Sequence, residues 1–147
     1  MFFICSYHLA MFFGKYFREA IMIGYVTIGA LDSEASGKFY DAVLGALGDE
    51  RKFADGGWIG YGPKGENSHY AYVCPPHDKQ PARPGNGIML AFKGHSKEEI
   101  DAAHAAGMAN GGTDEGGPGF RPPEGKEFYG AYLRDPTGNK ICVFFKT

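Results

Sequence analysis

The chain carries little net charge and few cysteines. Its 15 Lys and Arg residues against 17 Asp and Glu residues leave a net charge of −2. Nucleic acids and anionic membrane surfaces attract proteins through clustered positive charge, so this balance gives no electrostatic reason to expect either partner. The three cysteines, Cys5, Cys74 and Cys142, form no CxxC pair, and their odd number favours a reducing compartment. We therefore expect a cytoplasmic protein that binds neither nucleic acid nor membrane.

The sequence also lacks an apolar run long enough to span a membrane. Residues 1–13 are mostly apolar, but Ser6 and His8 interrupt them and the run is shorter than the roughly 20 residues of a spanning helix. A secretory signal would carry positive charge before the apolar run, whereas Lys15 and Arg18 follow it. We assign residues 1–21 to an N-terminal extension. It is either the product of an upstream start codon or a helix that covers an apolar patch on the domain or on a second subunit.

Glycine and proline are abundant, with 23 and 9 residues. They fall between apolar segments that alternate like strands, so they indicate turns rather than disorder. A length of 147 residues fits one domain with a sizeable core. We expect that domain to cover residues 22–147.

Residues 22–74 predict a first module with the element order β-α-β-β-β. A strand over 24–31 runs into Asp32 and Ser33, which are natural helix N-caps. Apolar residues then recur with helical spacing as far as Gly48, where the helix should end. Three short strands are expected at 50–54, 58–61 and 69–74, separated by turns.

The proline-rich segment 75–86 is a connection, because proline removes the backbone donors that the centre of a sheet needs. Residues 87–147 then predict a second module. It has a strand at 87–93, a helix that begins at a Ser96–Glu99 capping box, and strands at 128–133 and 140–145. We interpret the stretch from 111 to 125 as a loop at a mobile edge of a cavity.

The two halves of the domain repeat as a pattern. A constant offset along the chain places Tyr25 onto Met89, Val26 onto Leu90 and Ile28 onto Phe92. Few residues are identical, so the repeat is one of side-chain type. A duplicated βαβββ module predicts an α+β fold. A ferredoxin-like pair of modules would show the same elements without a cavity.

Residues 129–145 predict the hairpin that closes the second module. Pro136 presets the first turn angle, Gly138 can adopt positive φ, and Asp135 and Asn139 can hydrogen-bond the local backbone. We also expect Arg134 to brace the hairpin through Asp135.

This Arg-Asp-Pro-x-Gly-Asn hairpin and the duplicated order together resemble the vicinal-oxygen-chelate superfamily, which includes glyoxalases, extradiol dioxygenases and bleomycin-resistance proteins. The resemblance covers about residues 22–147. It implies two βαβββ modules that form a half-open barrel around a cavity, with module one at 22–74, the connection at 75–86 and module two at 87–147.

In metal-dependent relatives, the resemblance implies ligands on the inward faces of the first and last strands of each module. The corresponding residues here are Tyr25, Met89 and Cys142, with a fourth position around 70–72. This set holds no imidazole or carboxylate for a divalent ion. We therefore predict no metal and no cofactor, unless a divalent metal occupies a site displaced from these positions. The five histidines form no HxH or HxxxH pair that would indicate such a site.

Aromatic walls suit a planar or thioether-bearing small molecule. Trp58, Tyr61, Tyr129 and Tyr132 lie on the expected strands, and alternation should turn about half of them into the core. Arg121 and Arg134 are the candidate cations for an anionic group. The residues predicted to line the cavity are Tyr25, Trp58, Tyr72, Met89, Arg121, Tyr132 and Cys142.

These observations predict a glyoxalase- or bleomycin-resistance-like protein with a degenerate metal site, which binds a small apolar or aromatic molecule. The alternative is a lyase or dioxygenase of the same superfamily that uses a displaced metal, or Cys142 and a tyrosine as acid–base groups. Whether the chain is an enzyme stays open. We expect a homodimer, in which modules pair within one chain or exchange between chains.

Overall fold

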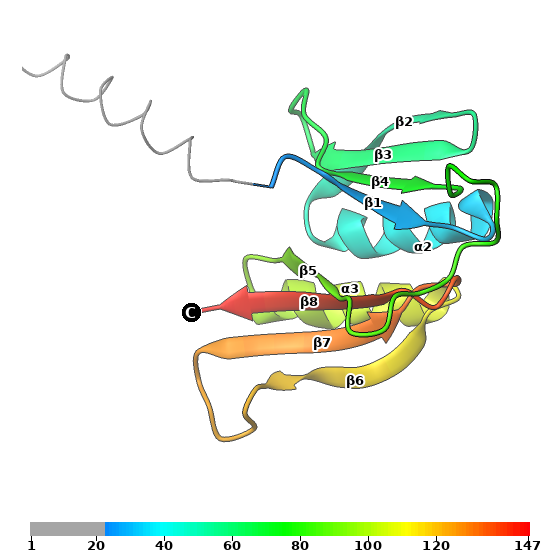
Figure 1. The fold of residues 1–147 in the computed structure, drawn as a ribbon. Coiled ribbons are helices and arrows are strands. Elements are labelled where there is room, and N and C mark those ends of the chain that lie inside the picture. The colour runs from blue at the N-terminus through cyan, green and yellow to red at the C-terminus, as the bar shows by residue number, and fades with distance from the viewer. Residues whose placement is uncertain (1–22) are drawn as a thin grey trace, which may run out of the picture.

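The computed structural model describes residues 23–147, and the N-terminal extension expected over residues 1–21 lies outside them. The described chain forms two four-stranded sheets (Figure 1). Sheet A has the order β1-β4-β3-β2 and contains β1 (Val26–Gly29), β2 (Asp49–Asp55), β3 (Trp58–Pro63) and β4 (Ala71–Cys74). Sheet B has the order β5-β8-β7-β6 and contains β5 (Leu90–Lys93), β6 (Thr113–Phe120), β7 (Phe128–Arg134) and β8 (Lys140–Lys146).

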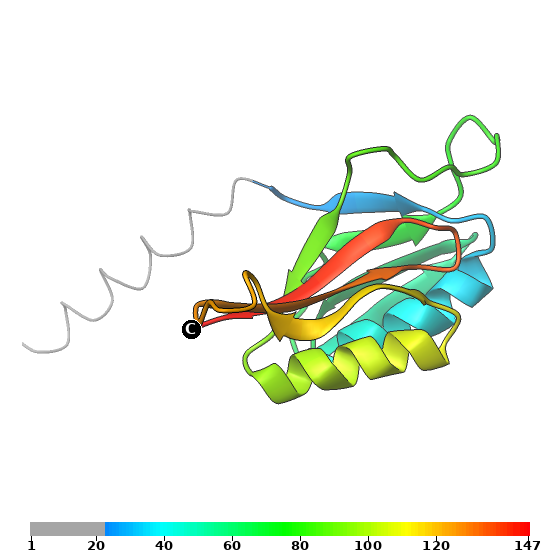
Figure 2. The ribbon, with the colours of Figure 1, turned by 90° about the horizontal axis from the view of Figure 1, so that it is seen from below.

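The two modules share one topology, which confirms the predicted repeat. β1 pairs in parallel with β4, β5 pairs in parallel with β8, and the other neighbouring strands are antiparallel. The helices α2 (Ser33–Ala46) and α3 (Lys97–Ala109) pack side by side and cover the same side of both sheets (Figures 1 and 2). We call the other side of the two sheets the open face. The sheets do not close on each other, so the fold is half-open as predicted.

Local capping fixes where the helices begin. Asp32 is the N-cap of α2, and its carboxylate accepts the backbone N–H groups of Glu34 and Ala35 at 2.9 and 3.0 Å. In α3 only half of the predicted capping box forms. The Ser96 hydroxyl accepts the Glu99 N–H at 3.2 Å, but the Glu99 carboxylate accepts the N–H of the residue before the cap. Within residues 23–147, no helix is both long and apolar enough to cross a membrane.

The stretch predicted as a loop contains the edge strand β6, so that prediction was wrong. The ladder between β6 and β7 shifts register twice, between Asp114 and Gly116 and between Gly116 and Gly119. An edge strand needs partners on one side only, and therefore tolerates the glycines and Pro118 of this segment. β6 is the strand that the predicted second module lacked.

The core lies between the helices and the sheets. Its largest fully buried side chains are Tyr40, Tyr61, Phe39, Leu44, Ile100 and Leu133. Val26 and Leu90 pack against this core and Val143 lies within it. Successive strand residues point to opposite faces. Tyr25, Met89 and Cys142 each precede one of these core residues, so they lie toward the open face.

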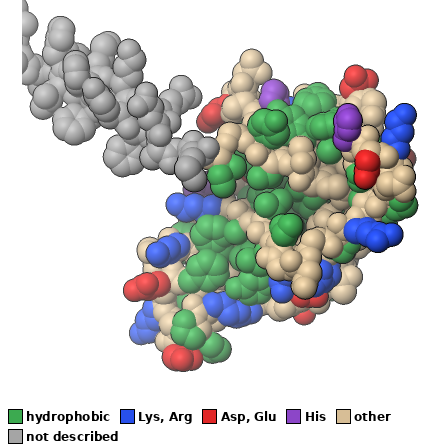
Figure 3. Space-filling model, viewed as in Figure 1, with side chains coloured by type: hydrophobic (Ala, Val, Ile, Leu, Met, Phe, Trp, Pro, Cys, Tyr) green, Lys and Arg blue, Asp and Glu red, His purple; other side chains and the backbone are tan. Residues whose placement is uncertain are grey.

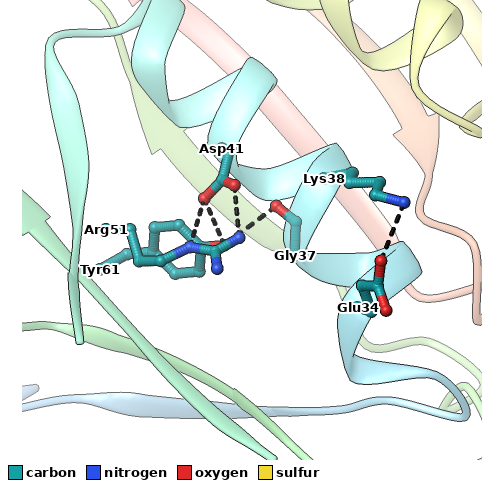
Figure 4. Close-up of polar contacts among 6 residues, drawn as sticks. All are labelled: Glu34, Gly37, Lys38, Asp41, Arg51 and Tyr61. Atoms are coloured by element: carbon teal, nitrogen blue, oxygen red, sulfur yellow. Dashed lines mark hydrogen bonds and ion pairs between the residues drawn. The ribbon is translucent and has the colours of Figure 1, made fainter. Parts of the chain in front are cut away.

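A carboxylate fastens α2 to sheet A (Figure 4). The Arg51 guanidinium donates through Nε to Asp41 at 2.9 Å. The buried Tyr61 hydroxyl donates to Asp41 at 3.0 Å and to the Gly37 carbonyl at 3.1 Å. Burial, followed by the neighbouring Asp41 charge, raises the pKa of Tyr61, so the phenol remains a donor. The exposed Glu34–Lys38 pair beside it, at 3.1 Å, adds little stability.

A second, buried carboxylate joins the two modules. Asp135 is only 3% exposed and lies in the turn between β7 and β8. It accepts the backbone N–H groups of Thr137 and Asn139, both at 2.9 Å, as the turn chemistry predicts. It also accepts the hydroxyl of Tyr40, from α2 of the first module, at 3.0 Å. The turn is therefore also a junction between modules.

The same turn makes two further bonds to the first module. The Leu31 N–H donates to the Thr137 hydroxyl at 3.0 Å, and the Asn139 amide donates to the Gly29 carbonyl at 2.9 Å. Arg134, however, does not brace the turn through Asp135. Its guanidinium contacts Glu115 and the Gly138 carbonyl instead.

We predict that Tyr40→Phe lowers the free energy of unfolding by about 1–3 kcal/mol, because the buried Asp135 carboxylate loses a donor. Urea unfolding followed by circular dichroism measures this change. Tyr129→Phe is the matched control, since its hydroxyl bonds the carboxylate of Asp101 at 2.9 Å in an exposed pair. Equal losses in the two variants would contradict a special role for the junction.

Candidate functional site

Sheet A carries an aromatic cluster on the open face, centred on Tyr72 of β4. The ring centre of Tyr72 lies 5.4 Å from that of Tyr25, 6.0 Å from Phe53, 6.2 Å from Trp58 and 6.0 Å from His69. These five residues are the aromatic cluster. Edge and tilted contacts of this kind are the geometry that aromatic pairs prefer.

Backbone register brings the cluster together. Gly60 of β3 pairs with Tyr72 on one side and with Phe53 on the other. A register shift between Arg51 and Phe53 in β2 accompanies this pairing. A Cβ atom at Gly60 would lie 2.4 Å from the Phe53 ring, so the ring occupies space that only glycine leaves free.

The cluster is exposed although its members are large and apolar. Tyr25 is 64% exposed and Trp58 is 41% exposed. Among residues 23–147, no helix covers this side of sheet A (Figures 1 and 2). Figure 3 shows apolar side chains gathered over both sheets on the same face. Soluble proteins seldom expose contiguous apolar surfaces except where they bind another molecule, so this face is the candidate binding surface.

Sheet B carries a second group, built around Tyr132 of β7. Tyr132 pairs with Cys142 of β8. The Arg121 guanidinium carbon and the Lys140 ammonium nitrogen each lie 5.7 Å from the centre of the Tyr132 ring. Arg121 is held there by hydrogen bonds to the carbonyls of Phe120 at 3.0 Å and Gly117 at 2.8 Å. Cations at this distance from an aromatic face are attracted by its electrons.

Cys142 lies beneath this group rather than at its surface. The side chain is 1% exposed, and its sulfur lies 3.7 Å from the Val143 carbonyl. Burial raises the pKa of the Cys142 thiol to about 11, although the positive charges of Arg121 and Lys140 oppose the shift. A thiol with this pKa is protonated at neutral pH, so the geometry favours packing over nucleophilic chemistry.

The structure places six of the seven predicted site residues in two groups. Tyr25, Trp58 and Tyr72 belong to the aromatic cluster. Arg121, Tyr132 and Cys142 lie together on sheet B.

Tyr25 and Met89 were expected within strands, but each lies one residue before the start of its strand. Met89 lines a cleft of about 530 Å³ together with Lys140. Tyr61 and Tyr129 turn toward the core, as strand alternation predicts for about half of the aromatic residues.

Three residues of these groups were not predicted from the sequence. Phe53 fell within a predicted strand, but the register shift that turns it to the open face has no signal in the residues alone. His69 is the first residue of the strand expected at 69–74 and lies just before β4 in the structure. Lys140 could have been found, because it stands two residues before Cys142 on the same strand and therefore shares its face. His104 of α3, whose side chain is 14% exposed, pairs with Asp114 of β6 at 2.8 Å.

The positions that hold metal in metal-dependent relatives do not fit a divalent ion here. Tyr25 offers a phenol, Met89 a thioether and Cys142 a buried thiol whose pKa is raised. Zinc and harder divalent ions favour imidazole, carboxylate or thiolate ligands. Elsewhere in the described part of the chain, no three His, Cys, Asp or Glu side chains gather as metal ligands. A metal-free site therefore stays a prediction that this donor set supports.

Two βαβββ modules with helices on one side and an open face on the other define a class of small-molecule-binding and catalytic folds. The chain belongs to the Glyoxalase/Bleomycin resistance protein/Dioxygenase superfamily, whose family model matches residues 22–143.

Solved structures of similar proteins share this fold. A glyoxalase/bleomycin resistance protein from Albidiferax ferrireducens T118 is 44% identical, with a TM-score of 0.77, over 85% of this chain and 99% of that one. A glyoxalase-related enzyme from Fulvimarina pelagi is 24% identical, with a TM-score of 0.66, over 86% and 88% of the two chains. A lactoylglutathione lyase from Agrobacterium tumefaciens is 23% identical, with a TM-score of 0.58, over 87% and 96%. These last two show the fold alone. No curated protein matches the chain.

We predict that Cys142 resists alkylation in the folded protein. At pH 8 a pKa of about 11 in place of 9.0 lowers the thiolate fraction roughly 100-fold, and burial slows the reaction further. Iodoacetamide labelling with mass spectrometry of the Cys142 peptide measures the rate, and the urea-unfolded protein is the control. Rapid labelling of the folded protein at pH 8 would show that Cys142 is accessible and reactive.

Proposed function

We propose that this protein binds a small apolar or aromatic molecule on its open face and that the aromatic cluster is the main contact surface. One observation carries the proposal. Five aromatic side chains from separate segments of the first module converge on an exposed sheet surface, where none of them is needed for the core. A planar ligand that buries about 200 Å² of apolar surface there would gain roughly 5 kcal/mol before the cost of association.

Membership of the superfamily supports a small-molecule role, and the donor set supports binding without a metal. The alternative of a lyase or dioxygenase that uses Cys142 is less well supported, because the thiol is buried and its pKa is raised. We therefore propose a binding protein rather than an enzyme, with no cofactor.

The proposal includes a homodimer. A second copy could cover part of the exposed cluster and turn an open surface into a more enclosed one, which small ligands prefer. The Asp135 junction, which joins the two modules of one chain, supports pairing within a chain. Light scattering at micromolar concentration tests the assembly, and a monomer would reject this part of the proposal.

The neutral dye N-phenyl-1-naphthylamine tests the proposed surface. Trp58 is the sole tryptophan of the chain, so energy transfer from tryptophan to dye reports binding near the cluster. We expect saturable transfer in the parent protein. Tyr72→Ala should weaken dye binding about tenfold, because Tyr72 contacts every other ring of the cluster.

Met108→Ala is the matched control. Met108 lies on α3, on the other side of the sheets, and its 42% exposure is close to the 41% of Trp58. Its removal should leave dye affinity within twofold of the parent. Two results would reject the proposed surface, because they would place the dye elsewhere. One is saturable binding that Tyr72→Ala does not weaken, and the other is binding without energy transfer from Trp58.

A further inference from the structure

The connection between the modules forms one wall of a cleft at the end of sheet B. Pro84 packs on the β7–β8 turn, where a Cβ atom at Gly138 would lie 3.4 Å from its ring. From there the chain makes a turn closed by a bond from the Ile88 N–H to the Gly85 carbonyl at 3.4 Å. The cleft has a volume of about 530 Å³ and is lined by the segment 84–89 together with Arg134 and Lys140. This volume suits a small organic molecule.

The cleft has an excess of positive charge. The Arg134 guanidinium lies 2.6 Å and the Lys140 ammonium 3.1 Å from the two carboxylate oxygens of Glu115. Hydrogen bonds from Arg134 and Lys140 lower the pKa of Glu115, which keeps it ionised at neutral pH. One carboxylate thus faces two cations, and one positive charge is left over. Arg134 is also held by a bond from Nη1 to the Gly138 carbonyl at 2.8 Å, so its orientation is fixed.

The wall formed by the connection ends in two exposed apolar side chains, which line the same cleft as Arg134 and Lys140. Ile88 is 66% exposed and Met89 is 42% exposed. Neither belongs to the core. A smaller neighbouring cleft of about 200 Å³ shares Ile88 and Lys140 with the first and adds a further cation, Arg83. The combination of fixed cations and exposed aliphatic side chains matches a ligand with a charged end and an apolar body.

We propose that this cleft binds a small organic carboxylate. The carboxylate lies between Arg134 and Lys140, and the apolar body packs on Ile88 and Met89. Arginine offers a planar fork of donors to a carboxylate, and lysine adds a compact charge beside it. A neutral ligand would leave the excess charge without a partner. The site lies on sheet B and is independent of dye binding to the aromatic cluster on sheet A, so it goes beyond the proposed function.

Sodium benzoate is the probe, with benzamide as its neutral counterpart of nearly equal shape. The measurement is a titration of the full chain followed by ¹H–¹⁵N correlation spectra. We expect benzoate to shift the amide signals of residues 85–89, 134 and 140 in a saturable way. Benzamide should bind at least tenfold more weakly, because it lacks the charge. Inorganic phosphate, which has the charge but no apolar body, should also bind at least tenfold more weakly.

Three variants test the contacts. Lys140→Gln should weaken benzoate binding about tenfold, because the excess positive charge is lost. Lys140→Met retains the length of the side chain and should act in the same way, and it serves if the first variant does not fold. Glu115→Gln removes the competing carboxylate and should strengthen binding several-fold. Lys93→Gln, which removes an exposed lysine of β5 outside the cleft, is the matched control and should leave binding within twofold of the parent.

The outcomes separate clearly. Saturable shifts at these amides, with a preference for benzoate and opposite effects of the Lys140 and Glu115 variants, would support the site. The site would be overturned if benzamide or phosphate bound as tightly as benzoate. It would also be overturned by shifts confined to other amides, or by a Lys140 variant that folds and binds benzoate like the parent. Failure of the dye to bind at Trp58, with benzoate still bound in the cleft, would reject the proposed function and leave the anion site standing.

Discussion

The buried carboxylate of Asp135 is the constraint on which the rest of the structure depends. A charge removed from water is tolerated only when donors surround it, and the donors come from both modules. The turn supplies backbone N–H groups, and Tyr40 supplies a hydroxyl from a helix 95 residues away in the chain. The carboxylate therefore accepts its full set of hydrogen bonds only when the modules are docked. In the docked fold the two helices also pack against each other, on one side of both sheets (Figure 2).

Because both helices lie on one side of the sheets, the other sides of the two sheets together form the open face. Sheet A contributes the aromatic cluster, and sheet B contributes Arg121, Lys140 and the ring of Tyr132. A cleft that touches β1 at Thr27 and the start of β5 at Leu90 shows that the facing edges of the sheets are neighbours. The open face thus offers a ligand apolar contact at one end and positive charge at the other.

Much of this arrangement could be predicted from local chemistry. The turn residues at 135–139, the N-cap Asp32 and the alternation that sends Tyr61 inward and Trp58 outward all act over a few residues, where sequence patterns are informative. What could not be predicted depends on the whole sheet. β6 consists largely of glycine and charged residues and has no alternating apolar pattern, so it was interpreted as a loop, although an edge strand tolerates this composition. The position of Phe53 follows from a register shift, and that of Arg134 from its contact with the same missed strand.

The placement of the open face opposite the helices also separates two kinds of substitution. Side chains such as Phe39 and Leu44 are fully buried between helix and sheet, and a smaller residue there leaves a cavity that destabilises the fold. Exposed side chains such as Tyr25 and Ile88 contribute little to that packing, so their replacement changes stability only slightly. A chain built in this way can exchange the residues that meet a ligand while its scaffold stays intact. Ligand preference can therefore drift among related chains without a matching change in thermal stability.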